Sequence, residues 1–201
     1  MQIIIHRVNT LEKLSKVSTE FGIEIDIRGY GNKLYLSHDP LDNHLDYCEL
    51  ETLLNAYQHK IIVFNVKEAG YEQKIIDCAK NYNIDNYFFL DVEFPYFYNA
   101  TRKLNFKKIA IRFSEAEPIE NVLAQVTKNT PLCDWVWIDT NTTLPLSTNS
   151  VQQLQNFKTC LVCPERWGRP EDIKPYRKKL EDINFKLDAV MTSLECVEYW
   201  N

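Results

Sequence analysis

Short apolar runs recur along the chain, and polar or charged stretches separate them. The runs are rich in β-branched and aromatic residues, which is typical of buried strands. The predicted strands cover residues 2–5, 23–27, 61–66, 87–90, 109–111, 135–138, 159–163 and 187–191. The pattern therefore predicts eight strands.

Between these runs, apolar residues recur with the spacing of an amphipathic helix. The clearest sets are Leu50, Leu53, Leu54 and Tyr57, and Ile119, Val122, Leu123 and Val126. Weaker sets are Leu11, Leu14 and Phe21; Tyr71, Ile75, Ile76 and Ala79; Val151, Leu154 and Phe157; and Ile173, Tyr176 and Leu180. We expect Pro170 near the start of the last of these helices, and Asn149 or Ser150 as the cap of the helix before it.

Strands that alternate with helices indicate an α/β fold, either a doubly wound open sheet or a closed barrel. The nearly even repeat favours a compact (β/α)8 TIM barrel. This architecture usually takes about 250 residues, so a chain of 201 residues needs short helices or loops in their place. The sequence has no linker-like stretch, which predicts a single domain over residues 1–201. Glycine-rich nucleotide-binding motifs are missing after the predicted strands.

The charge balance bears on the partners of the protein. A formal net charge of -5 argues against nucleic-acid binding, which needs clustered Lys and Arg. No apolar run is long enough to span a bilayer, and the apolar part of the N-terminus is too short for a signal peptide. We therefore expect a soluble, cytoplasmic protein without stable membrane insertion, and the oligomeric state stays open.

The six cysteines are scattered through apolar segments, which predicts reduced thiols packed in the core. Cys160 and Cys163 form a C-x-x-C pair, but the pair lies in a strand-like run without a second pair at zinc-finger spacing. Core packing is the prediction for both.

The predicted second strand alternates isoleucine with charged residues. Ile23, Ile25 and Ile27 share one face, so Glu24 and Asp26 share the other. In a half-exposed sheet such acids would simply face water. In a parallel barrel neither face is open to bulk water, so the carboxylates are expected in the barrel interior near its carboxyl-terminal mouth.

Two buried carboxylates repel each other and lose hydration unless a cation or proton compensates them. A hard divalent ion bound by oxygen atoms meets this need. The sequence therefore predicts a divalent cation, Mg²⁺, Ca²⁺ or Mn²⁺, between Glu24 and Asp26, and it offers no Cys/His set for structural zinc.

Two histidines follow strand-like runs. His6 comes directly after the first strand, and His38 follows the run Lys33-Leu34-Tyr35-Leu36. Catalytic groups of a barrel lie at strand ends, so both are candidates for acid/base chemistry. The remaining histidines, His44 and His59, fall in loop or helix-end positions and are expected at the surface.

Taken together, His6-Arg7, then Glu24-x-Asp26, then His38-Asp39 resembles the signature of the glycerophosphodiester phosphodiesterase family, whose fold is similar to that of bacterial phosphatidylinositol-specific phospholipase C. The resemblance spans essentially the whole chain and is most specific in the first forty residues. It implies a metal-dependent phosphodiesterase that cleaves a small glycerol- or sugar-type phosphodiester with two histidines.

The same resemblance implies roles for individual residues. His6 and His38 would be the catalytic acid/base pair, with His6 as the base and His38 as the acid. Arg7 and Lys67 would contact the phosphate. Glu24 and Asp26 would be metal ligands.

The chain departs from the family pattern at two places. Asn65 stands in the Asn65-Val66-Lys67 run where the family usually supplies a third acidic ligand, and an amide oxygen can still coordinate Mg²⁺ or Ca²⁺ with lower affinity. After His6-Arg7 the usual family residues are replaced by Val8-Asn9-Thr10-Leu11. The identity of the substrate is therefore not carried over.

Other polar residues at predicted strand ends are candidates for the lining of a pocket. Arg112 and Glu165 are expected to contact the substrate. Arg112 could instead pair with Asp139, and Trp137 or Trp167 could belong to the core or stack on a sugar or glycerol.

Two other functions remain open. One is a metal-independent, phospholipase C-like enzyme that places a basic residue where the ion would lie, although Glu24 and Asp26 together argue against it. The other is a non-catalytic barrel that binds a phosphate ligand or a protein partner, which Asn65 and the small size favour. Sensitivity of turnover to a chelator separates the first hypothesis from both.

Overall fold

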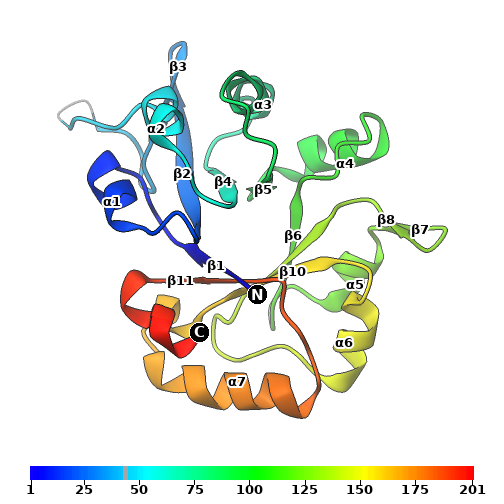
Figure 1. The fold of residues 1–201 in the computed structure, drawn as a ribbon. Coiled ribbons are helices and arrows are strands. Elements are labelled where there is room, and N and C mark those ends of the chain that lie inside the picture. The colour runs from blue at the N-terminus through cyan, green and yellow to red at the C-terminus, as the bar shows by residue number, and fades with distance from the viewer. Residues whose placement is uncertain (43–44) are drawn as a thin grey trace. The chain divides into compact units, whose positions relative to one another are not determined.

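The computed structural model describes residues 1–42 and 45–201, so His44 lies outside the described residues. The chain folds into two compact units. We call Ile4–Tyr98 the N-terminal unit, and Met1–Ile3 together with Asn99–Asn201 the C-terminal unit. Figure 1 shows the elements of both by label.

The N-terminal unit is built around β2, the longest strand. Its helices and strands are β1 (Gln2–Ile5, which begins in the other unit), α1 (Leu11–Lys16), β2 (Gly22–Tyr30), β3 (Lys33–Leu36), α2 (Leu50–Ala56), β4 (Ile62–Val66), α3 (Glu72–Asn81) and β5 (Tyr87–Leu90). β2 pairs in parallel with β1 and β4, and β4 pairs in parallel with β5. β3 pairs antiparallel with the end of β2.

The C-terminal unit repeats the alternation of parallel strands and helices. After α4 (Phe94–Arg102), which crosses the boundary, its elements are β6 (Ala110–Phe113), α5 (Ile119–Leu123), β7 (Val126–Thr127), β8 (Thr130–Pro131), β9 (Trp135–Ile138), α6 (Thr148–Leu154), β10 (Lys158–Val162), η1 (Pro164–Trp167), η2 (Pro170–Asp172), α7 (Ile173–Asp182), β11 (Ala189–Thr192) and η3 (Leu194–Tyr199). β6, β9, β10 and β11 pair in parallel in this order. The backbone N–H of Gln2 donates to the carbonyl of Asp188 at 2.7 Å, which brings the start of β1 beside the start of β11.

The strand order is β5-β4-β2-β1-β11-β10-β9-β6, with β3 attached to β2. Apart from β3, β7 and β8, each strand is parallel to its neighbours and is joined to the next by a helix, which is the order of a (β/α)8 barrel. The predicted α/β fold class is confirmed, and all eight predicted strands are present.

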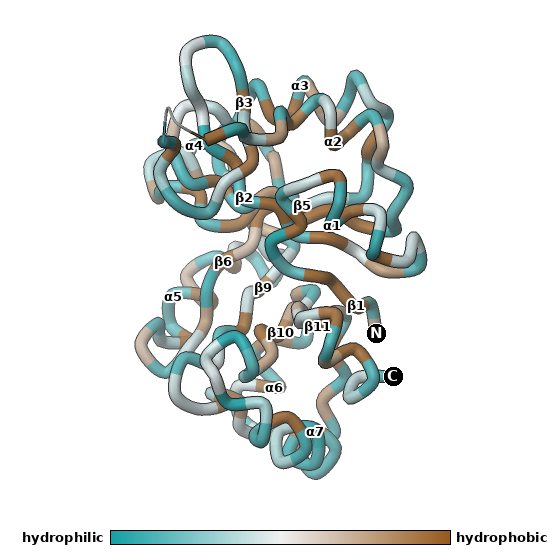
Figure 2. The backbone as a smooth tube through the Cα atoms, turned by 90° about the vertical axis from the view of Figure 1, so that its left-hand side faces the viewer, coloured by the Kyte–Doolittle hydropathy of each residue, from teal (hydrophilic) through white to brown (hydrophobic). Residues whose placement is uncertain are grey.

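Hydrophobic residues concentrate on the strands. Ile23, Ile25 and Ile27 of β2 and Phe64 of β4 are fully buried or nearly so. Burying a side chain of this size contributes about 1.5–3 kcal/mol. Figure 2 shows the hydrophobic colour along β1, β2 and β10, whereas the connecting loops are mostly hydrophilic. The alternation of β2 therefore sets one face against the helices and leaves Glu24 on the other.

The helices are short, as the chain length predicts. α5 has five residues, α1 has six, and the last strand is followed only by the 3-10 helix η3. α4 and the β7–β8 hairpin were not predicted from the sequence, and Val126 belongs to β7 rather than to the end of α5. Ser147, not Asn149 or Ser150, caps α6, because the Ser147 side chain accepts from the backbone N–H of Ser150. Pro170 begins η2, directly before α7, as expected.

The thiols agree with the sequence analysis. All six cysteines are free, and all except Cys48 are buried. Cys160 lies in β10 and Cys163 just after it, which confirms core packing for this pair. Among the described residues, no helix has the length and apolar character needed to cross a membrane.

Candidate active site

Glu24 and Asp26 project from the same face of β2. Glu24 is 2% exposed and Asp26 is fully buried, so both carboxylates are withdrawn from water. The period of two that predicted a shared face is confirmed. Because burying two negative charges side by side is costly, the groups that surround them decide what this place can do.

The loop after β1 is the first of these surroundings. The backbone N–H of Arg7 donates to Glu24 Oε2 at 2.6 Å, and the N–H of Val8 donates to the carbonyl of Glu24 at 2.8 Å. Arg7 has a φ of 51°, in the left-handed region that residues with a Cβ rarely adopt. This turn directs the Arg7 N–H at the carboxylate.

Asn9 holds Asp26 at two points. Its Nδ2 donates to Asp26 Oδ2 at 2.9 Å, and its Oδ1 accepts the backbone N–H of Asp26 at 2.9 Å. The amide therefore fixes the rotamer of Asp26. In the sequence, Asn9 stands out only as part of a departure from a family pattern. The one sequence signal was an amide three residues after His6, and this was too weak to place it on Asp26.

β4 supplies the next two groups, since its register sets Asn65 beside Asp26. Asn65 Nδ2 donates to Glu24 Oε1 at 2.8 Å and to Asp26 Oδ1 at 3.2 Å. Lys67 Nζ lies 3.2 Å from Asp26 Oδ1 and 3.8 Å from Asp91 Oδ2. We call Glu24, Asp26, Asn65 and Lys67 the carboxylate cluster.

The electrostatics of the cluster show an excess of negative charge. Burial, and next the charge of Asp26, raise the pKa of Glu24 to about 7. The Arg7 N–H, Asn65 and Lys67 act in the opposite direction, but a single ammonium does not balance two carboxylates. The cluster therefore has the electrostatic character of a site for a cation or a proton.

The loops that carry the two histidines both hydrogen-bond to β2. His6 precedes Arg7, whose N–H reaches Glu24, and the His6 carbonyl accepts from Lys13 Nζ at 2.7 Å. Two residues further along β2, the N–H of Ser37 donates to the Asp26 carbonyl at 3.0 Å, and His38 follows Ser37. Each histidine is thus adjacent in sequence to a residue that hydrogen-bonds to a cluster member.

His38 has partners that orient it. Its Nδ1 lies 2.8 Å from Asp39 Oδ1, and its carbonyl accepts from Arg28 Nη2 at 2.9 Å. The hydrogen bond with His38, and then its charge, lower the pKa of Asp39. When Nδ1 carries the proton toward Asp39, Nε2 is the atom that can exchange a proton with a substrate.

Arg112 and Glu165 belong to the C-terminal unit, whereas the other predicted site residues belong to the N-terminal unit. Arg112 Nη1 donates to Asp139 Oδ2 at 2.6 Å, which confirms the anticipated ion pair. Asp139 also accepts from Trp167 Nε1 at 2.9 Å, and Trp137 is buried. Glu165 Oε1 accepts from Thr192 Oγ1 at 3.0 Å and from the N–H of Ser193 at 2.7 Å.

The donor set of the cluster fits a hard divalent ion. In the part of the chain that the structure describes, no group of three or more His, Cys, Asp or Glu side chains could hold a metal ion. An ion at the cluster would therefore rely on two carboxylates and an amide. Asn65 Oδ1 is buried and has no hydrogen-bond partner. Turned toward Glu24 and Asp26, this oxygen would complete a set of three oxygen ligands of the type that Mg²⁺ and Ca²⁺ accept.

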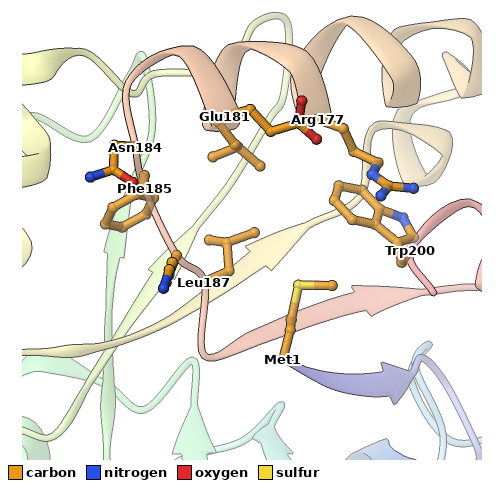
Figure 3. A pocket seen from close by; sticks show the side chains of 9 residues that line it. Met1, Arg177, Glu181, Asn184, Phe185, Leu187 and Trp200 are labelled. Carbon is orange, nitrogen blue, oxygen red and sulfur yellow. The ribbon is translucent and has the colours of Figure 1, made fainter.

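A separate cavity of about 530 Å³ lies in the C-terminal unit, lined by Met1, Arg177, Leu180, Glu181, Asn184, Phe185, Lys186, Leu187 and Trp200. Figure 3 shows Arg177 and Glu181 extending from α7, with Trp200 to one side. Leu187 and Met1 lie just before β11 and β1, so the cavity is at the amino ends of these strands. Functional residues of a (β/α)8 barrel lie at the carboxyl ends, and none of the predicted site residues lines this cavity.

Three solved structures share the fold. A glycerophosphodiester phosphodiesterase from Agrobacterium tumefaciens is 11% identical, with 95% of this chain and 96% of that chain covered and a TM-score of 0.64. A putative glycerophosphoryl diester phosphodiesterase from the same species is 12% identical, with 100% and 96% covered and a TM-score of 0.68. A glycerophosphoryl diester phosphodiesterase from Parabacteroides distasonis is 11% identical, with 98% and 85% covered and a TM-score of 0.62. No family model matches the chain, and no curated protein matches its sequence.

Proposed function

We propose that this chain is a metal-dependent phosphodiesterase that cleaves a small glycerol- or sugar-type phosphodiester with two histidines as acid and base. The observation that carries the proposal is the buried pair Glu24 and Asp26 on one face of β2, with the Lys67 ammonium on Asp26. A pair of this kind is costly for folding alone and suits a site that binds a cation.

Two further observations support the proposal. Three solved structures that share the fold carry the names of glycerophosphodiester or glycerophosphoryl diester phosphodiesterases. The residues of the His-Arg, Glu-x-Asp and His-Asp motifs, which are separated along the sequence, belong to one compact unit. The free thiols suit a reducing cytoplasm, where we place the enzyme and its substrate.

The proposed mechanism assigns each group a task that its position allows. Glu24, Asp26 and Asn65 Oδ1 would hold the ion, which supplies charge stabilisation for the phosphoryl oxygens when it is bound. Arg7 and Lys67 would meet the non-bridging oxygens of the phosphodiester. His6 would take a proton from the attacking nucleophile, and His38 Nε2 would give one to the leaving oxygen.

The test is hydrolysis of a glycerol phosphodiester such as glycerophosphoethanolamine, measured with Mg²⁺, Ca²⁺ or Mn²⁺ and with a chelator. We expect turnover that the chelator abolishes and that the double variant Glu24→Gln/Asp26→Asn lacks at every ion concentration. Calorimetric titration should show ion binding to the wild type and none to the double variant. Equal binding to both proteins would contradict the proposed ion site.

A second candidate is a metal-independent phosphodiesterase, and one observation favours it. All four oxygens of Glu24 and Asp26 already lie on protein donors: the Arg7 N–H, Asn9, Asn65 and Lys67. Turnover that persists in the chelator would select this candidate. Phosphate binding without turnover would select the non-catalytic barrel.

A further inference from the structure

In the side-chain amide of Asn65, the nitrogen is hydrogen-bonded and the oxygen is not. Its Nδ2 reaches one oxygen of each carboxylate, at 2.8 Å from Glu24 and 3.2 Å from Asp26. Its Oδ1 is buried and has no partner. A buried amide normally satisfies both atoms, so the unsatisfied oxygen calls for an explanation.

Electrostatics explains the orientation of this amide. With the opposite orientation, Oδ1 would face Glu24 Oε1 and Asp26 Oδ1, and three oxygens with negative charge or partial charge would converge in a buried place. The Lys67 ammonium, 3.2 Å from Asp26 Oδ1, offsets only part of that repulsion, and a divalent cation among the three oxygens would offset the rest. The amide N–H group is therefore expected to face the carboxylates in the ion-free chain, and the amide oxygen is expected to face them in the ion-bound chain.

The rest of the cluster is fixed in a way that leaves Asn65 to make the change. Arg7 N–H holds Glu24 Oε2, and Asn9 holds Asp26 through two hydrogen bonds. The Arg7 N–H and Asn9 Nδ2 engage Glu24 Oε2 and Asp26 Oδ2, the carboxylate oxygens that Asn65 does not contact. The carboxylates can thus keep their places while the Asn65 amide rotates about its last side-chain bond.

We propose that Asn65 is a built-in substitute for the ion: its amide N–H group bridges Glu24 and Asp26 when no ion is present, and it turns its oxygen to the ion when one binds. The inference rests on the proposed function for the existence of the ion. It has two consequences. The fold does not depend on the ion, and the ion binds weakly because it must displace the Asn65 hydrogen bonds.

The experiment compares thermal unfolding of the wild type, Asn65→Asp and Asn65→Ala, each in chelator and in Mg²⁺, Ca²⁺ or Mn²⁺. Asn86→Asp is the matched control, because Asn86 is exposed in the same unit and donates to the Lys60 carbonyl instead. We expect Asn65→Asp to melt well below the wild type in chelator and to recover most of the loss with the ion. The wild type and Asn86→Asp should respond much less to the ion.

Asn65→Ala keeps the inference testable if the aspartate variant does not fold. It removes the bridge without adding charge, so it should melt below the wild type in chelator and gain more from the ion than the wild type does. Calorimetry should show ion affinity raised by at least about tenfold in Asn65→Asp, because the third ligand gains a full negative charge.

Two results would overturn the inference: variants of Asn65 that melt like the wild type in chelator, or a wild type that gains as much from the ion as Asn65→Asp does. None of these measurements requires turnover. If hydrolysis fails while the Asn65 pattern is found, the proposed function is wrong and the inference stands. If hydrolysis is seen and the pattern is not, the inference alone is wrong.

Discussion

Two buried carboxylate sites, one in each unit, differ in how their charge is balanced. In the C-terminal unit, Asp139 has a guanidinium at 2.6 Å and accepts further hydrogen bonds from Trp167 and the N–H of Thr140. In the N-terminal unit, the Lys67 ammonium lies 3.2 Å from Asp26, and Glu24 accepts hydrogen bonds from the Arg7 N–H and Asn65. At Asp139 one carboxylate is paired with one guanidinium, whereas at Glu24 and Asp26 the negative charge is in excess.

The difference shows that residue type and position at a strand end are not enough to identify a reactive site. Acids and bases occur at both places, and both acidic places are buried. What distinguishes the carboxylate cluster is an uncompensated negative charge, which a cation or a proton can neutralise. The comparison therefore predicts that changes in the N-terminal unit affect turnover most and that changes at Asp139 affect stability.

The largest effect is expected for the two histidines. His6→Ala and His38→Ala should each lower turnover of an alkyl phosphodiester by about 10²–10⁴-fold, the usual contribution of one acid or base. On a p-nitrophenyl phosphodiester, whose leaving group needs little protonation, the acid variant His38→Ala should recover and His6→Ala should not. The double variant should lose less than the sum of both effects, because the residues act as a unit. Wild-type rates for both single variants would end the two-histidine mechanism.

The next largest effect is expected for Lys67 and Arg7, the two residues proposed to contact the phosphate. Lys67→Ala removes the ammonium from buried Asp26, so we expect a loss of about 1–3 kcal/mol of stability in addition to weaker phosphate binding. Arg7→Ala should weaken phosphate binding while its melting temperature stays near the wild-type value, since the contact with Glu24 comes from the backbone. The measurements are denaturant unfolding and protection of the melt by phosphate. An Arg7 variant that loses more stability than the Lys67 variant would reverse this assignment.

A smaller effect is expected for the ion pair between Arg112 and Asp139. Among the described residues, Arg112→Ala leaves the carboxylate of Asp139 with the neutral donors Trp167 and the N–H of Thr140, so it should cost about 1.5–3 kcal/mol of stability. A double-mutant cycle with Asp139→Asn isolates the interaction between the two side chains. KM for the phosphodiester, measured on the same variants, tests whether Arg112 also contacts substrate. A coupling energy near zero would remove the contrast between the two sites.

The smallest effect concerns His59, a histidine of the N-terminal unit outside the cluster. It is half-buried rather than exposed, and its Nε2 lies 3.1 Å from the Val17 carbonyl. Burial lowers the pKa of His59, although the hydrogen bond to Val17 acts in the opposite direction. Because the unfolded chain then binds the proton more readily, this contribution to stability is present above the unfolded pKa. It is lost as the pH falls from about 6.5 toward the lowered folded value.

His59→Gln should therefore flatten the dependence of stability on pH in that window, which urea unfolding at a series of pH values would measure. Turnover should not change. A variant that loses turnover instead would extend the reactive region beyond the carboxylate cluster.

Much of the fold could be predicted because buried strands have a recognisable pattern of apolar residues in the sequence. The alternation at Ile23, Ile25 and Ile27 fixed both the strand and the face of Glu24, since a shift by one residue would expose the isoleucines. α4 was missed because its aromatic run resembles a strand, although Pro95 in its first turn favours a helix. The β7–β8 hairpin was missed because it turns on Lys128 and Asn129 with positive φ, which the helical spacing of the preceding residues conceals.

The candidate site was predictable in its ionisable residues and not in its amides. Glu24 and Asp26 are recognisable from spacing within one strand. Asn9 is not, because its role depends on a hydrogen bond to a residue 17 positions away, which only the pairing of β1 with β2 brings near. The orientation of Asn65 is set by charges on a neighbouring strand, and no local pattern encodes it.

The left-handed backbone of Arg7 has a consequence for engineering. Glycine would adopt this φ without strain, whereas a residue with a Cβ gives up about 1–2 kcal/mol to do so. A library screened only for heat resistance should therefore select Arg7→Gly, and the same library screened for phosphodiester cleavage should reject it. With the phosphate contact that we propose for Arg7, thermostability and activity would be under opposing selection at position 7.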